Sequence, residues 1–326
     1  MKNGRFFTAI ALSSIMLSSV IASPSASASE PKFILAGDSW PGYAPFWVAK
    51  KLGYFRGINF VFIKSETRDP LLLSGKVDAA NLSMNQIIEN YSKGYKAPIV
   101  IPMDYSDGAD AIVSDKTIGN VAELCGHKIG LNTESYSELL LLGALSTVHK
   151  PLSCVRQINM QASSVPAALM SNDIKIGVTW QPNVGIAISR DKNLHVLFSS
   201  KNVPGLISDN IVFKRGFLKR HPKESKAVLE GYLQGLKYIH NHPNKSYVIM
   251  SSYMGVSPSE VKEIYSGVHN FTYAEMKSMV DGSAKMSYAV SIPYVISILK
   301  YQHDIPADYS AKWNEFVDPR LVESLP

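Results

Sequence analysis

The sequence predicts an α/β fold made of two lobes, with the second lobe inserted into the first. Short apolar runs alternate with helical patterns along the first two thirds of the chain. This alternation is typical of mainly parallel sheets flanked by helices. The last third is almost entirely helical, and the chain has the length at which proteins commonly divide into two lobes.

The N-terminal residues predict an export signal and not a part of the fold. Lys2 and Arg5 precede a serine-rich apolar run at 6–21, and an Ala-x-Ala cleavage motif ends at Ala28. This is the pattern of a bacterial secretory signal peptide, spanning 1–28. An uncleaved anchor is the alternative, although a membrane span needs about 20 apolar residues. We therefore expect a free periplasmic protein.

The first lobe is expected to begin with an α/β set in which most helical runs end at a glycine, a common stop signal. Its strands are expected at 33–36, 58–64, 77–82, 98–103 and 109–113, and its helices at 45–52, 69–74 and 85–92.

A second α/β set follows, and the chain then returns to the first sheet. The expected strands are 128–131, 155–159, 175–179 and 194–198, with helices at 135–147, 165–170 and 183–190. A returning strand at 211–213 precedes helices at 224–241, 257–267, 273–287 and 291–300. The predicted bounds are therefore 29–113 with 205–326 for lobe 1, and 114–204 for lobe 2. A ligand site is expected between the lobes, at the C-terminal ends of strands.

The two cysteines are predicted to form a disulfide. Cys125 and Cys154 each precede an expected strand, and neighbouring parallel strands would place these positions side by side. An even cysteine count in an oxidising compartment supports a bridge. Two free buried thiols are the alternative.

Composition and motifs argue against several other functions. The formal charge of +6 falls to about +4 when the signal peptide is removed, and basic residues form no extended run, so we expect no nucleic-acid partner. The eight histidines are scattered, and no Ser-His-Asp pattern, GxGxxG or phosphate loop occurs. We therefore expect no metal site, no cofactor and no catalysis.

Six segments occur in one order along the mature chain. They are GDSWPGYAPFWVAKKLGYF, GKVDAANLSM, DYSDGADAIVS, VAELCGHKIGLNTESYSELLLLGAL, GVTWQPNVGIA and PGLISDNIVFKRGFLKRHPKESKAVLEGYLQGLKYI. Together they resemble periplasmic solute-binding proteins of ABC importers, in the nitrate/sulfonate/taurine group. The resemblance implies a type II two-lobed clamp that closes on a small molecule and delivers it to an ABC permease in the inner membrane. It also implies a monomer.

The resemblance places ligand contacts in the loops that follow strands. The predicted ligand-binding residues are Asp38, Ser39, Trp40, Tyr43, Ser83, Met84, Asp104, Tyr105, Thr133, Glu134, Ser135, Tyr136, Trp180, Gln181 and Asp209. Several have a structural alternative: Trp40 as a core residue under a loop, and Ser83 or Ser135 as a helix cap.

The charges in these loops favour a cationic, amine-bearing or zwitterionic ligand. Asp38, Asp104, Glu134 and Asp209 are acidic, aromatic residues lie among them, and the same loops contain no lysine or arginine. Carboxylates and ring faces suit a positive group. The alternatives are a sulfonate or taurine-type anion, a sensor module for a membrane receptor, and an enzyme related to thiamine-pyrimidine synthesis. That enzyme's cysteine-rich iron-binding motif has no counterpart in this sequence.

Export makes a direct prediction about the mature protein. N-terminal sequencing of periplasmic material is expected to begin at or near Ser29, because cleavage follows Ala28. Cell fractionation that leaves the protein in the cytoplasm would contradict this prediction.

Overall fold

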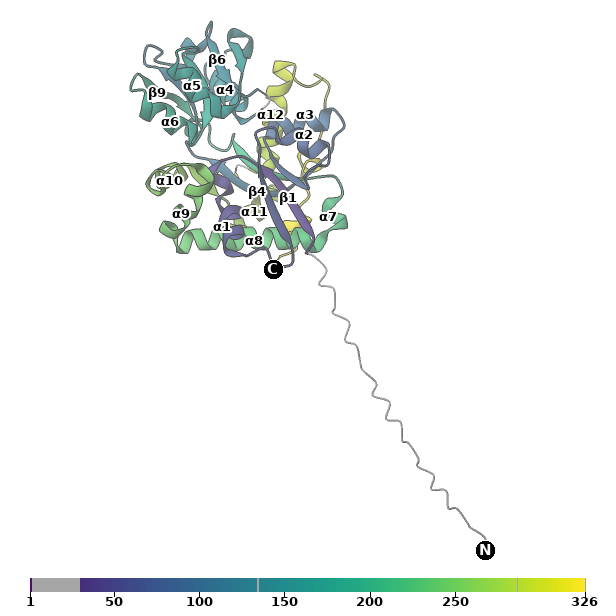
Figure 1. Cartoon of the computed structure of the whole chain (residues 1–326). Helices are drawn as coiled ribbons and strands as arrows, with labels where there is room; N and C mark the ends of the chain where they lie inside the picture. The colour runs from purple at the N-terminus through teal and green to yellow at the C-terminus, as the bar shows by residue number, and fades with distance from the viewer. Residues whose placement is uncertain (2–29, 134, 286, 326) are drawn as a thin grey trace. The chain divides into compact units, whose positions relative to one another are not determined.

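Two sheets organise the chain in the computed structural model, which describes residues 1, 30–133, 135–285 and 287–325. Among these residues, the first sheet has six strands in the order β11-β4-β10-β3-β1-β2. The second sheet has five, in the order β7-β6-β8-β5-β9. Figure 1 shows β6, β9 and helices α4 to α6 grouped in one body, and β1, β4, α1, α8 and α11 in another. The predicted two-sheet α/β fold is confirmed.

The strands follow the apolar runs of the sequence closely. Their bounds are β1 Lys32–Gly37, β2 Asn59–Lys64, β3 Ala79–Leu82, β4 Ile99–Ser106, β5 Asp110–Asp115, β6 Lys128–Leu131, β7 Arg156–Asn159, β8 Ile176–Trp180, β9 Leu194–Ser199, β10 Ser208–Phe213 and β11 Val268–Asn270.

The helices cover the faces of both sheets. Their bounds are α1 Ala44–Leu52, α2 Arg68–Leu73, α3 Met84–Ser92, α4 Tyr136–Thr147, α5 Val165–Met170, α6 Asn183–Arg190, α7 Phe217–Arg220, α8 Pro222–Asn241, α9 Pro243–Met254, α10 Pro258–Tyr265, α11 Tyr273–Val280, α12 Tyr288–Gln302 and α13 Arg320–Glu323. Sequence patterns missed α9 and the edge strand β11, and the helix expected at 273–287 ends at Val280.

Each sheet has a parallel core and one central antiparallel strand. In the first sheet β1 pairs in parallel with β2 and β3, while β10 is antiparallel to β3 and β4. In the second, β6 pairs in parallel with β7 and β8, while β5 is antiparallel to β8 and β9. The chain enters the second sheet through β5 and returns to the first through β10, and the edge strand β11 is also antiparallel to β4.

The strand expected at 109–113 in the first lobe belongs to the second sheet instead. Sequence alternation identifies a strand but does not say which sheet it joins, and β5 pairs along its length with β8 and β9. We therefore place the first crossing just before β5 and the second between β9 and β10. The division of the chain into two moving lobes remains a proposal.

A close helix contact orders the first lobe's core. Helix α1 begins with Pro45 in its first turn, where a missing N–H does no harm, and ends at Gly53 in the left-handed conformation. It packs along α8 at Gly235, where a Cβ would lie only 2.1 Å from the carbonyl oxygen of Pro45. Gly235 therefore permits the two backbones to approach, and this fixes the corner that follows β1.

The disulfide between Cys125 and Cys154 is present. The backbone amide of Gly126 also donates to the carbonyl oxygen of Cys154 at 2.7 Å, just before β6 and β7 begin. The predicted parallel neighbours and their bridge are both confirmed.

The predicted signal peptide falls on residues outside the described range, so its structure is not addressed. No helix in the described part of the chain combines the length and the apolar character needed to cross a membrane.

Removing the disulfide is expected to lower stability. The double substitution Cys125→Ser with Cys154→Ser opens a loop with a sequence separation of 29. The chain-entropy model gives a loss of about 3.6 kcal/mol. Chemical denaturation of the wild type and the double variant would measure it, and equal stability of the two proteins would contradict the expectation.

Candidate functional site

A small buried cavity lies where residues of both sheets meet. It is lined by Asp38, Trp40, Asp110, Tyr136, Trp180 and Asp209. Its volume is about 10 Å³, which is the space taken by about one water molecule. Acidic and aromatic side chains therefore converge at one point from segments far apart in the sequence.

Asp38, directly after β1, is held in a buried ion pair. Its carboxylate accepts from Nη1 of Arg68, the first residue of α2, and the arginine is only 3% exposed. The Arg68 Nε atom donates to the carbonyl oxygen of Asn81 at 3.0 Å. The second carboxylate oxygen of Asp38 accepts from the backbone amide of Trp40 at 2.7 Å. The charge of Asp38 is therefore matched within the protein.

Asp104 supports the cavity wall from behind and does not line it. Its Oδ1 atom accepts from Nε1 of Trp40 at 3.0 Å, which fixes the indole ring. A Cβ at Gly42 would lie 2.1 Å from Asp104 Oδ2, so the glycine lets this carboxyl fit against the turn. Asp104 is therefore a positioning group for Trp40.

Asp209 lines the cavity from β10. It is the cross-strand partner of Asp104 in the antiparallel pairing of β10 with β4, so the two carboxyls are neighbours on one face. Asn81 on β3 donates to Asp209 Oδ1 at 2.9 Å, and Asn81 Oδ1 accepts from the Tyr136 hydroxyl at 3.3 Å. Asn81 therefore joins β10 to the start of α4, which belongs to the other sheet's lobe.

Two strands of the second sheet contribute side chains to the cavity lining: β5 contributes Asp110 and β8 contributes Trp180. They are cross-strand partners in the pairing of β5 with β8. Asp110 is 2% exposed, and its Oδ2 atom has no hydrogen-bond partner among the described residues. The backbone amide of Asp110 donates to Ser106 Oγ at 3.0 Å, which fixes the start of β5.

Three carboxyl groups at the site, those of Asp104, Asp110 and Asp209, have raised pKa values. Burial, with the nearby Asp38 carboxylate, raises the pKa of Asp209 to about 7, although Asn81 and Arg68 act in the opposite direction. Burial and Asp209 raise the pKa of Asp104 well above its usual range. Burial also raises the pKa of Asp110, against a hydrogen bond from Ser106. The cavity therefore favours a proton, or another positive charge, beside these groups.

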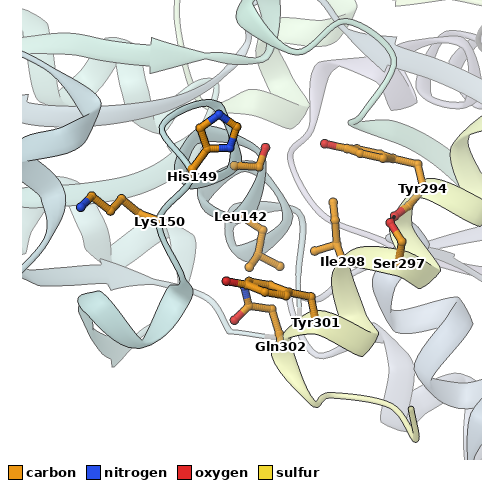
Figure 2. Close-up of a pocket in the computed structure, with 9 residues that line it drawn as sticks. Leu142, His149, Lys150, Tyr294, Ser297, Ile298, Tyr301 and Gln302 are labelled. Atoms are coloured by element: carbon orange, nitrogen blue, oxygen red, sulfur yellow. Dashed lines mark hydrogen bonds between the residues drawn. The ribbon is translucent and has the colours of Figure 1, made fainter. Parts of the chain in front are cut away.

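A larger groove lies elsewhere, between α4 and α12. Figure 2 shows Leu142 with His149 and Lys150 on one side, and Tyr294 and Tyr301 on the other. Its volume is about 380 Å³, but none of its lining side chains is a buried polar group without a partner among the described residues. The groove is larger than the cavity, but the cavity has a buried polar atom without a partner among the described residues, so we assign the site to the cavity.

The structure brings together five of the predicted ligand-binding residues and leaves the others outside the cavity lining. The five are Asp38, Trp40, Tyr136, Trp180 and Asp209. Three others serve helix ends: Gln86 Oε1 accepts from the amide and hydroxyl of Ser83, Ser135 Oγ accepts from the Ser137 amide, and Gln181 Oε1 accepts from the Gly185 amide. The capping alternatives for Ser83 and Ser135 are therefore supported.

The remaining predicted residues have other surroundings. Tyr43 and Met84 are buried in the core, and Tyr105 packs its ring on His269 at 4.9 Å. The Thr133 amide donates to Asn159 at 3.3 Å. Ser39 is half-buried beside the cavity but does not line it, and Glu134 lies outside the described residues.

Sequence reasoning missed Arg68, Asn81 and Asp110. Arg68 looked like an ordinary polar residue at a helix start, and Asn81 lay inside an apolar strand. A polar residue within an otherwise apolar strand is the one signal that pointed to Asn81, because a buried amide must find partners. Asp110 sits at the start of a strand that was assigned to the wrong sheet.

The raised carboxyl pKa values predict that stability falls as pH rises. Between pH 5 and pH 8 the unfolded chain has already lost protons from its aspartates, whereas the folded protein still holds some on the buried groups. The folded protein therefore binds more protons, and the free energy of unfolding decreases with pH. Asp209 contributes fully below its usual pKa, and this contribution is lost as pH rises through about 7.

Asp209→Asn removes one of these groups, so its melting temperature should fall less between pH 5 and pH 8 than that of the wild type. Asp308→Asn, at an exposed position, is the matched control and should follow the wild type. Parallel declines in all three proteins would contradict the assignment of a proton to Asp209.

Comparison with known proteins gives a family. The family model "NMT1/THI5 like" matches residues 40–246, well over half of the chain. The chain is also 23% identical over 266 residues to the taurine-binding periplasmic protein of Escherichia coli (strain K12), covering 77% of this chain and 79% of that protein.

Solved structures confirm the fold. The periplasmic aliphatic sulphonate binding protein SsuA of Escherichia coli superposes with a TM-score of 0.70 at 15% identity, covering 89% of this chain and 93% of that one. The desulfurization enzyme DSZB has a TM-score of 0.62 at 11% identity, covering 90% and 98%, so the fold by itself is compatible with catalysis. The chain belongs to the NMT1/THI5 like family.

Proposed function

We propose that this protein is the periplasmic solute-binding component of an ABC importer and that its solute carries a positive group. The observation that carries the proposal is the cavity itself, where acidic and aromatic side chains of both sheets meet. The solute would be an amine or a zwitterion, held there and delivered to an inner-membrane permease.

The charge balance of the cavity supports a cationic group. Among the described residues, an ion pair between Asp38 and Arg68 lies beside the cavity, and its guanidinium is already occupied by a carboxylate and by the carbonyl of Asn81. The described lining residues include no lysine or arginine, and neither Asp110 nor Asp209 forms an ion pair within the described chain. A simple anion would face these carboxyl groups with no free cation to hold it.

The size of the cavity supports a moving clamp. A space of about 10 Å³ admits a water molecule and excludes an organic solute, so a solute enters only when the walls move apart. Contacts that such opening would break include the Tyr136 hydroxyl on Asn81 and the Ala162 amide on Glu66, at 3.0 Å. Hinge rotation at the two crossings, before β5 and before β10, is the simplest motion that does this.

A taurine-type solute is the second candidate, because a curated relative is a taurine-binding protein. Taurine carries both charges, so it fits the acidic cavity through its ammonium end. A purely anionic sulfonate does not.

The sign of the solute's charge can be tested by substitution. For a solute held through a cation, Asp209→Asn should weaken binding by about 2–5 kcal/mol, the range for breaking a buried, hydrogen-bonded charge pair. Trp40→Ala should also weaken binding, through loss of a ring face. Calorimetry with any solute found in a thermal-shift screen would measure both.

The screen would contain amines, amino acids, guanidino compounds and aminopyrimidines on one plate, and alkyl sulfonates, nitrate and bicarbonate on another, with taurine on both. Asp308→Asn is the matched charge control and should bind like the wild type. Hits confined to the purely anionic compounds, with affinity unchanged or improved in Asp209→Asn, would contradict a cationic solute and leave the binding-protein assignment intact.

A further inference from the structure

Two carboxyl groups that form no ion pair with the described residues face the cavity from different sheets. Asp110 begins β5 of the second sheet, and Asp209 lies on β10 of the first. Both are nearly fully buried and both line the same cavity. Since β5 and β10 are the strands next to the two crossings, these side chains come from the two segments through which the sheets are connected.

The other two acidic side chains nearby differ from this pair: one forms an ion pair and the other lies outside the cavity lining. Asp38 is paired with Arg68 and accepts from the Trp40 amide. Asp104 does not line the cavity, and the indole of Trp40 and the turn at Gly42 lie against it. Asp104 Oδ2 is also buried without a hydrogen-bond partner among the described residues, but it does not face the cavity. The carboxyl acceptors that line the cavity without an ion pair in the described chain are therefore those of Asp110 and Asp209.

Asp110 supplies the observation that identifies the missing group. Its Oδ2 atom is buried and has no hydrogen-bond partner among the described residues, although the residue lines the cavity. Buried carboxyl oxygens in folded proteins almost always accept a hydrogen bond. A donor that is not part of the described chain is therefore expected at this atom.

Aromatic walls attract any cation, but carboxyl oxygens distinguish between cations. Trp40, Tyr136 and Trp180 line the cavity, and their ring faces would attract a trimethylammonium group as well as a primary ammonium group. A quaternary ammonium has no N–H and would leave the Asp110 oxygen unpaired. A primary ammonium, an amidinium or a guanidinium has at least two N–H donors and can serve two acceptors at once.

We propose that Asp110 and Asp209 jointly accept hydrogen bonds from one N–H-bearing cationic group of the solute, which thereby links the two sheets, and that the site discriminates against quaternary ammonium solutes. This inference rests on the proposed cationic solute. It makes Asp110 a specificity-determining residue, and the N–H donors are the feature that it recognises.

The test uses pairs of solutes that differ only in N-methylation: ethanolamine with choline, glycine with its trimethyl betaine, and taurine with its trimethyl betaine. Binding of each compound to the mature protein would be measured by calorimetry at pH 8. In at least one pair the N–H-bearing member should bind about ten- to hundredfold more tightly, the usual range for a hydrogen bond to a charged group.

Asp110→Asn should weaken both members through loss of the negative charge, and should weaken the N–H-bearing member further through loss of a carboxylate acceptor, so that the preference shrinks. Asp308→Asn, with the same charge change at an exposed position, should preserve the preference. The methylation comparison needs only wild-type protein, so a poorly folded variant does not remove the test.

Three other results would be decisive against the inference. Equal or tighter binding of the quaternary members would overturn it and leave the cationic solute in place. An N–H preference that persists unchanged in a folded Asp110→Asn protein would remove Asp110 as its source. Binding of alkyl sulfonates or nitrate with no binding of any cationic compound, or no binding by either set, would overturn the cationic solute and this inference with it.

Discussion

The buried ion pair between Asp38 and Arg68 is the contact on which the arrangement of the cavity depends. Arg68 neutralises one carboxylate and, through Nε, fixes the carbonyl of Asn81. Asn81 then orients Asp209 and accepts from Tyr136, so one guanidinium influences residues of both sheets. Removing either member of such a pair leaves a buried uncompensated charge, which destabilises a protein more than an apolar replacement of both. The pair thus stabilises the acidic cavity while taking no solute itself.

Local patterns in the sequence were enough to predict most of the helices and strands, because apolar runs, prolines and glycines reflect the backbone conformation directly. The strand end at Gly37 and the helix stop at Gly53 are examples. Side-chain contacts such as ion pairs between residues far apart in the sequence could not be predicted from local patterns. Arg68 lies 30 residues from Asp38 in the chain, and nothing in its own neighbourhood indicates burial. Asp110 was missed for a different reason: the side chains that a strand directs toward a cavity depend on which sheet the strand joins, and alternation does not determine that.

The positive charge of the solute was inferred from acidic residues in loops, and the structure gives two of these residues roles other than binding a solute. Asp38 is neutralised, and Asp104 lies behind the wall, so neither adds an unmatched charge to the cavity. Asp110 lines the cavity instead, and its buried Oδ2 atom has no hydrogen-bond partner among the described residues. The cavity lining is therefore acidic, as predicted, although Asp110 was not among the predicted acidic residues. A relative named for taurine and a structure named for aliphatic sulphonates are compatible with the same fold, because the solute's charge is decided by a few side chains at the strand ends.

Protons and a solute cation compete for the same oxygens in this cavity. With its walls in contact, the cavity buries Asp104, Asp110 and Asp209, and each carboxyl has a pKa above its usual value. Closing the walls on ionised carboxyls requires a compensating positive charge, which either bound protons or a cationic group can supply. A cation with several N–H donors supplies the charge and can also donate to carboxyls of both sheets, whereas a proton on one carboxyl supplies the same charge but only one O–H donor. An anion supplies neither. Under the proposed function, the contacts that hold the walls together would therefore also select the solute, because the closed arrangement is most stable when the group inside it neutralises carboxyls from both sheets.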